Sequence, residues 1–140
     1  MALESFKGPV ILDVPADPAA MFMVRALVGK FSERIGFEAL ESDRLILATD
    51  EACTNVIRHA YDNSGDGRIV ITFTLNPDNF EIMIRDFGKC TDPATFKGRD
   101  LDQIRPGGLG LHFIKSAVDR VEYDTPPGGG MLLKMVKLKP

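Results

Sequence analysis

The chain has little of several residue types that mark other protein classes. Its 140 residues include no tryptophan, two cysteines, two tyrosines and two histidines. Cys53 and Cys90 do not have the spacing of a zinc or redox pair, so the sequence indicates neither a disulfide framework nor a cysteine-based metal site. Cys53 falls within a predicted helix, and we expect it to be a small core residue.

The sequence also lacks membrane and targeting signals. No apolar run approaches the roughly 18 residues needed to span a bilayer, and the N-terminus has no secretory signal pattern. The net charge is -3 without a basic stripe, which argues against nucleic acid as a direct partner. With 44% hydrophobic and 26% charged residues, the composition is that of an ordinary globular protein. These features indicate a cytoplasmic protein without a membrane or nucleic-acid partner.

Two common nucleotide motifs are missing. There is no Gly-x-x-x-x-Gly-Lys-Ser/Thr loop. Gly108-x-Gly110 is not a dinucleotide fingerprint, because Phe113 stands where the third glycine would be and no strand immediately precedes it. A nucleotide site in this chain would therefore belong to another fold.

Apolar periodicity predicts alternating helices and strands. The predicted elements are a strand over 10–14, helices over 18–35 and 42–60, strands over 68–75 and 80–86, a helix over 109–118, and strands over 119–124 and 131–138. Gly36 ends the first helix and Ser42 is the predicted N-cap of the second. This order predicts one α+β domain over residues 1–140, a two-layer sandwich with helices packed on one mixed, mainly antiparallel sheet.

Residues 87–107 have no sustained apolar period. A loop of about 20 residues inside a compact domain is usually a lid or a binding loop. We therefore predict a lid over about 87–107.

One helix carries a carboxylate and a carboxamide four positions apart. Glu51 and Asn55 share a helical face, and Arg58 and His59 follow Asn55 at i+3 and i+4. A carboxylate can accept a proton from a hydroxyl, and an amide oxygen can bind Mg²⁺. Alone, this pattern also fits a solvated polar face, but the surrounding residues 49–55 are small and polar rather than rich in Lys and Glu.

Two further segments have residues suited to a nucleotide. Asp86 ends a predicted strand, where its carboxylate could accept a hydrogen bond from adenine N6, and Gly88 would let a flat base approach the backbone. Glycines over 107–110 precede a helix, where backbone N–H groups favour phosphate. Arg105 could add charge near the γ-phosphate. Taken singly, the first segment is also typical of turns and the second of a hinge.

Together these motifs resemble the GHKL (Bergerat-fold) ATP-binding superfamily. Residues 51–61, Glu-Ala-Cys-Thr-Asn-Val-Ile-Arg-His-Ala-Tyr, are most similar to the N box of its anti-sigma-factor serine/threonine kinase branch. Asp86-Phe-Gly88 matches the first glycine box, residues 107–114 match the second, and residues 128–134 stand where the last box would be. The resemblance covers essentially the whole chain and implies a stand-alone histidine-kinase-like ATP-binding domain.

The resemblance implies a role for each matching residue. Glu51 would be the catalytic base, Asn55 would bind Mg²⁺ and Asp86 would recognise adenine. The residues expected to bind ATP are Asn55, Arg58, His59, Asp86, Gly88, Arg105, Gly107, Gly108, Leu109, Gly110, Leu111, Gly129 and Gly130.

The resemblance also implies partners. Members of this branch phosphorylate a serine or threonine of a small anti-anti-sigma protein of the STAS type and bind a sigma factor in competition with it. Because such proteins are often dimers, we expect a homodimer.

The alternative is a nucleotide-dependent partner-switching module without efficient kinase activity. Two departures favour it: Cys90 replaces the second glycine of the first box, and Gly130 or Met131 replaces the threonine of the last. A third hypothesis, a mechanical ATPase, lacks support because no transducer domain is present.

Overall fold

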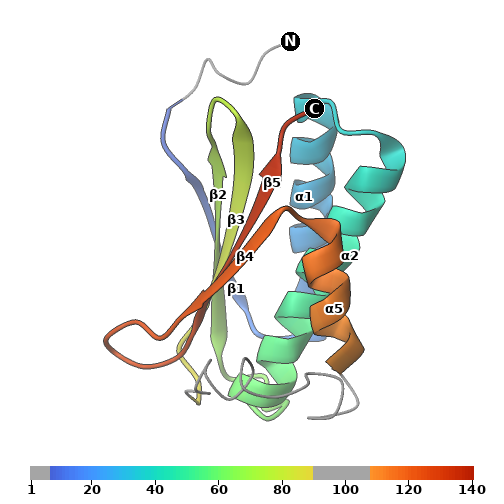
Figure 1. Ribbon diagram of the computed structural model, residues 1–140. Coiled ribbons are helices and arrows are strands. Elements are labelled where there is room, and N and C mark those ends of the chain that lie inside the picture. The colour runs from blue at the N-terminus through green and yellow to red at the C-terminus, as the bar shows by residue number, and fades with distance from the viewer. Residues whose placement is uncertain (1–6, 90–107) are drawn as a thin grey trace.

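The computed structural model describes residues 7–89 and 108–140, with no side chains described for 108–111. Helices α1, α2 and α5 form one layer against a five-stranded sheet (Figure 1). The predicted two-layer α+β fold is confirmed. Within the described ranges, no helix is long and apolar enough to cross a membrane.

The elements agree closely with the predicted order. They are β1 (Val10–Pro15), a 3-10 turn η1 (Pro18–Ala20), α1 (Met21–Ile35), α2 (Ala39–Asn55), a π-helical turn η2 (Val56–Ala60), β2 (Arg68–Leu75), β3 (Asn79–Asp86), α5 (Gly108–Ala117), β4 (Arg120–Asp124) and β5 (Leu132–Leu138). The strand order is β1-β2-β3-β5-β4, which puts β3 at the centre. All four neighbouring pairs that the described strands form are antiparallel.

The start of α2 differs from the prediction. The helix begins at Ala39, so Ser42 lies in its first turn and the prediction of Ser42 as the N-cap is wrong. Glu38 is the actual N-cap: its backbone is extended, and its carbonyl accepts a hydrogen bond from the Ser42 N–H at 2.9 Å. No side-chain cap contributes, so the start is not apparent from capping residues.

The end of the same helix also differs from a regular continuation. From Val56 to Ala60 the backbone forms a π turn, closed by a hydrogen bond from the Tyr61 N–H to the Val56 carbonyl at 3.2 Å. One residue more per turn rotates the side chains that follow relative to those of α2. Such turns occur often at functional sites.

The core lies between the helices and the sheet. Strand residues alternate between this core and the opposite face, as in β3, whose even-numbered residues from Phe80 to Asp86 are all buried. Phe31 of α1 packs on Phe73 and Phe80, with ring centroids 5.1 and 5.3 Å away. This aromatic cluster joins the helix layer to β2 and β3.

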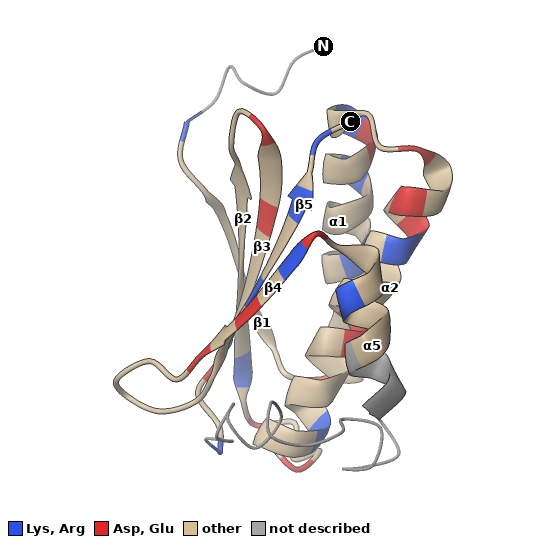
Figure 2. Cartoon of the chain, viewed as in Figure 1, with Lys and Arg blue, Asp and Glu red and all other residues tan. Residues whose placement is uncertain are grey.

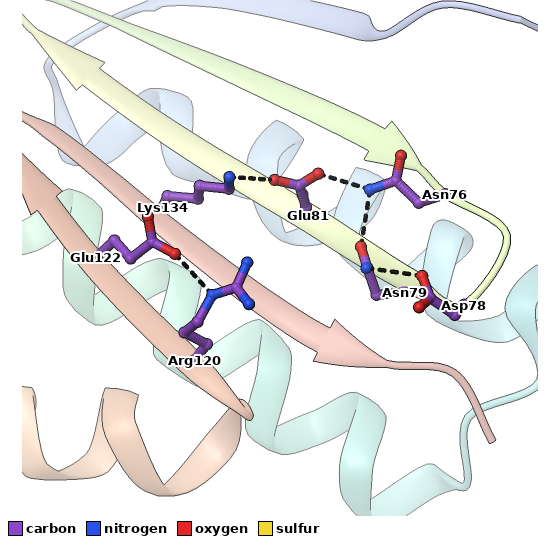
Figure 3. A network of polar contacts seen from close by, with 7 residues as sticks. All are labelled: Asn76, Asp78, Asn79, Glu81, Arg120, Glu122 and Lys134. Carbon is purple, nitrogen blue, oxygen red and sulfur yellow. Dashed lines mark hydrogen bonds and ion pairs between the residues drawn. The ribbon is translucent and has the colours of Figure 1, made fainter.

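The opposite face of the sheet carries a polar network (Figure 3). Glu81 on β3 bonds Lys134 of β5 at 2.9 Å and the Asn76 amide at 2.6 Å. Burial acts to raise the pKa of Glu81, but these two hydrogen bonds hold it below its ordinary value. Arg120 and Glu122 pair on the neighbouring edge strand β4. Positive and negative side chains are interspersed over the described elements (Figure 2).

Replacement of Phe73 by alanine should lower the free energy of unfolding by about 3–5 kcal/mol, because it removes a ring that is 1% exposed from the aromatic cluster. Ile11→Ala is the control: this side chain is 62% exposed and its loss should change stability by less than about 1 kcal/mol. Chemical denaturation of both variants tests the prediction, and equal losses would contradict it.

Candidate active site

The candidate site forms around the C-terminal end of β3. There Asp86 is followed by Phe87, which is hydrogen-bonded to Tyr61, and by Gly88, which packs on Ala60 of η2. On the other side, Asp86 contacts the segment between β4 and β5. Three of the segments singled out in the sequence are therefore brought together at this end of the sheet.

Asp86 is a buried carboxylic acid. It is 4% exposed, and its Oδ1 accepts a hydrogen bond from the Gly88 N–H at 3.1 Å. Burial raises the pKa of Asp86 above its ordinary value, and this outweighs the opposing effect of backbone hydrogen bonds from Gly88 and Met131 and of the Arg85 charge. Ionising such a group disfavours the folded state, and carboxylates with this property are concentrated at functional sites.

Gly130 makes the closest approach at this site. A β-carbon on Gly130 would lie 2.0 Å from the Asp86 carbonyl oxygen, and its φ of +74° is one that side chains rarely adopt. The Asp86 N–H also donates to the Met131 carbonyl at 3.0 Å. Only glycine therefore fits at position 130.

Arg85 links Gly129 to the end of β3 by hydrogen bonds. Its Nη1 donates to the Gly129 carbonyl at 2.8 Å and to the Asp86 carbonyl at 2.9 Å. The guanidinium also lies 4.5 Å from the ring centroid of Phe87, which is 52% exposed. Sequence reasoning missed Arg85, because two of its three partners are main-chain carbonyls that no side-chain pattern reveals.

Gly88 allows the Asp86 turn to contact η2. A β-carbon there would lie 2.3 Å from the Ala60 carbonyl oxygen. The same oxygen accepts a hydrogen bond from the Lys89 N–H at 2.9 Å. In the structure, the glycine at this position is explained by its packing against Ala60. That Gly88 also lets an adenine base approach the backbone stays a prediction from the sequence.

Glu51 and Asn55 lie in the last turns of α2, and both are half-buried. The Asn55 Oδ1 is buried and has no hydrogen-bond partner in the part of the chain that the structure describes. Burying a polar atom without a partner is unfavourable, and a hard oxygen ligand of this kind fits Mg²⁺. The neighbouring Asp50 is paired with Arg25 at 2.7 Å, whereas the structure gives the Glu51 carboxylate no such partner within the described ranges.

The other predicted site residues are only partly covered by the described structure. Arg58 and His59 are exposed on η2. Gly108, Leu109, Gly110 and Leu111 form the first turn of α5, while Arg105 and Gly107 lie outside the described residues. The predicted lid lies outside them from residue 90 onward, including Cys90; its first residues, 87–89, are hydrogen-bonded to η2 and its neighbour Tyr61.

Cys53 does not take part in this chemistry. It is fully buried, and burial together with the Asp50 charge raises the pKa of its thiol to about 12. It packs in the main hydrophobic cluster, which confirms it as a core residue.

Comparison with known proteins identifies the family. Residues 14–137 match the family model of the histidine kinase-like ATPase domain. The chain belongs to this family. The resemblance seen in the N box and the glycine boxes is thereby confirmed.

The similar curated relatives within this family carry the name serine-protein kinase RsbW. The relative from Halalkalibacterium halodurans is 31% identical over 134 residues, covering 90% of this chain and 80% of its own length. The Bacillus subtilis protein is 30% identical over 126 residues, with 84% and 78% coverage. The protein of Listeria monocytogenes serovar 1/2a is 31% identical over 132 residues, with 87% and 84% coverage.

Two solved structures share the fold. The RsbU and RsbW domains of Rv1364c from Mycobacterium tuberculosis align with a TM-score of 0.68 at 19% identity, covering 96% of this chain and 33% of that longer chain. The mycobacterial sensor histidine kinase MprB aligns with a TM-score of 0.59 at 18% identity, covering 93% and 98%. At these identities the likeness supports the histidine kinase-like fold alone.

Gly130→Ala should destabilise the protein more than Gly128→Ala. Both glycines have positive φ, so each alanine costs about 1–2 kcal/mol of backbone strain. Only the alanine at 130 also collides with the Asp86 carbonyl, because position 128 has nothing within 4 Å. We expect a further loss of about 1–3 kcal/mol. Melting temperatures of the two variants measure the difference, and equal values would contradict the close approach.

Proposed function

We propose that this protein transfers the γ-phosphoryl group of ATP to a serine or threonine hydroxyl of a small anti-anti-sigma protein of the STAS type. The enzyme class rests on the family, whose similar members are named serine-protein kinases. The observation that carries the proposal is that, among the described residues, the Glu51 carboxylate has no ion-pair partner and the buried Asn55 Oδ1, one helical turn away, has no hydrogen-bond partner. Gly88, two residues after the buried Asp86, packs on Ala60 of η2, the turn that follows this pair in the chain.

Glu51 is proposed to act on the accepting hydroxyl. The hydroxyl oxygen forms a bond to the γ-phosphorus while the bond from that phosphorus to the β–γ bridging oxygen breaks, and ADP leaves. The hydroxyl proton goes to the Glu51 carboxylate, whose oxygens form no ion pair with any residue that the structure describes. Positioning and charge stabilisation account for most of the catalysis of phosphoryl transfer, so few reacting side chains are needed.

Asn55 is the proposed Mg²⁺ ligand. In the described ranges, no group of three or more His, Cys, Asp or Glu side chains could hold a metal. A Mg²⁺ ion bound through the Asn55 Oδ1 would take its other ligands mainly from phosphate oxygens and water. Such an ion supplies neutralising charge on the phosphates.

The remaining expected ATP contacts stay part of the proposal. Asp86 would accept a hydrogen bond from the adenine amine, and the glycines at the start of α5 would face phosphate. Competitive binding of a sigma factor and a homodimeric state are proposed on the resemblance to the anti-sigma branch, and action in the cytoplasm on the composition of the sequence.

The alternative is a nucleotide-dependent switch that binds partners without efficient transfer. The departure in the last box favours it, because neither Gly130 nor Met131 offers the hydroxyl that threonine would supply there. The two functions are distinguished by whether phosphate appears on a serine or threonine of the anti-anti-sigma protein.

Glu51→Gln should abolish phosphate transfer while leaving ATP binding largely intact, because the amide keeps the size of the side chain and cannot accept the proton. Asp50→Asn is the matched control: the adjacent carboxylate is paired with Arg25 and should be dispensable for transfer. Transfer of radiolabelled phosphate and ATP titration measure the two properties. Equal loss of binding and transfer in Glu51→Gln would remove Glu51 from the role of base.

Asp86→Asn should weaken ATP binding without lowering the stability of the fold at neutral pH. Because burial raises the pKa of Asp86, the folded state binds its proton more tightly than the unfolded state does. The wild type therefore loses stability as pH rises from the ordinary value of 3.8 through the higher folded pKa, and the neutral asparagine does not.

At neutral pH we expect Asp86→Asn to melt no lower than the wild type and to bind ATP about 10- to 100-fold more weakly. Thermal melts across pH and ATP titration test this. A collapse of the melting temperature at every pH, without a specific loss of binding, would make Asp86 a structural residue.

A further inference from the structure

Tyr61, the last residue of the N-box string, bridges two main-chain segments. Its hydroxyl accepts a hydrogen bond from the Phe87 N–H at 2.7 Å and donates one to the Arg68 carbonyl at 2.8 Å. A phenol has a single proton, so donation to Arg68 leaves the oxygen free to accept from Phe87. The hydroxyl therefore joins the residue after Asp86 to the first residue of β2.

The Tyr61 ring is held in place by close packing. A β-carbon on Gly67 would lie 2.4 Å from three atoms of the ring, so the ring lies directly on the Gly67 backbone. Tyr61 is half-buried and also packs against the main hydrophobic cluster. Its hydroxyl position is thus set by the ring and by the start of β2.

The Asp86 turn has few other attachments on this side. The Ala60 carbonyl accepts from the Lys89 N–H at 2.9 Å, and Gly88 packs on the same group. Lys89 and Asp62 form an ion pair at 3.0 Å, but both side chains are more than 60% exposed and contribute little. The Tyr61 hydroxyl provides the hydrogen bond to the residue directly after Asp86.

We propose that Tyr61 is a positioning residue that sets adenine affinity and selectivity by holding the Asp86-Phe87-Gly88 turn against η2. The inference rests on the proposed role of Asp86 at the nucleotide. The hydroxyl does not touch the nucleotide: it fixes the direction of a carboxylate that does.

Tyr61→Phe removes the hydroxyl and keeps the ring on Gly67. We expect ATP affinity to fall by about 3- to 10-fold, and the preference for ATP over GTP to fall with it. In an Asp86→Asn background the same change should have little further effect, because the carboxylate being positioned is gone. Calorimetric titration of ATP and GTP into the wild type, both single variants and the double variant measures this.

Ser32→Ala is the matched control. It also removes one hydroxyl hydrogen bond, from Ser32 Oγ to the Val28 carbonyl at 2.8 Å, at a buried site on α1. Ser32→Ala should lower the melting temperature without changing the ratio of ATP affinity to GTP affinity. A Tyr61→Phe protein that loses stability but keeps that ratio overturns the proposal, as does one that loses ATP and GTP affinity equally.

Amide hydrogen exchange gives a second test that needs no nucleotide. The Phe87 amide should exchange slowly in the wild type and faster in Tyr61→Phe. If Tyr61→Phe does not fold, the exchange rate of the Phe87 amide in the wild type is the test. Fast exchange of this amide, without protection, overturns the proposal. Failure of the wild type to bind ATP would overturn the proposed function together with this inference, whereas normal binding with unchanged selectivity in Tyr61→Phe overturns only the latter.

Discussion

The burial of the Asp86 carboxyl group at the end of the central strand is the constraint on which the arrangement of this site depends. A carboxylate that is 4% exposed disfavours folding at neutral pH, as the raised pKa of Asp86 reflects. The surrounding backbone limits this penalty. The Gly88 amide donates a hydrogen bond to the carboxylate. The two glycines at this site are explained by close main-chain contacts around this residue: Gly88 packs on the Ala60 carbonyl and Gly130 on the Asp86 carbonyl.

The rest of the fold brings this acid to the N-box residues. Because β3 is the central strand, its end is flanked by main chain on both sides. One neighbour is the segment that leads into β5, fastened by Arg85, and the other is η2. The π turn connects the Asp86 turn directly to the helix that carries Glu51 and Asn55. Hydrogen bonds to Ala60 and Tyr61 join this helix end to the residues that follow Asp86.

The sequence predicts the architecture well because the strands alternate clearly. Each predicted strand agrees with the structure to within one residue at each end. The sequence predicts the structure less well where hydrogen bonds between backbone atoms determine it. The start of α2 depends on the Glu38 carbonyl and the π turn on a shifted hydrogen bond to Val56, so neither leaves a side-chain signal. Of the candidate site, Asp86, Gly88 and Gly130 were identifiable as motif residues, but Arg85 and Tyr61 bind mainly main-chain groups and had no predicted role. The tyrosine was visible only as the last residue of a motif.

The central claim is that these residues form a magnesium-dependent adenine nucleotide site. Calorimetric titration of the wild-type protein with ATP, ADP and GTP, each with and without Mg²⁺, tests it most directly. We expect saturable ATP binding that strengthens with Mg²⁺ and is tighter than the binding of GTP. An absence of ATP binding, or binding indifferent both to the base and to Mg²⁺, would contradict it.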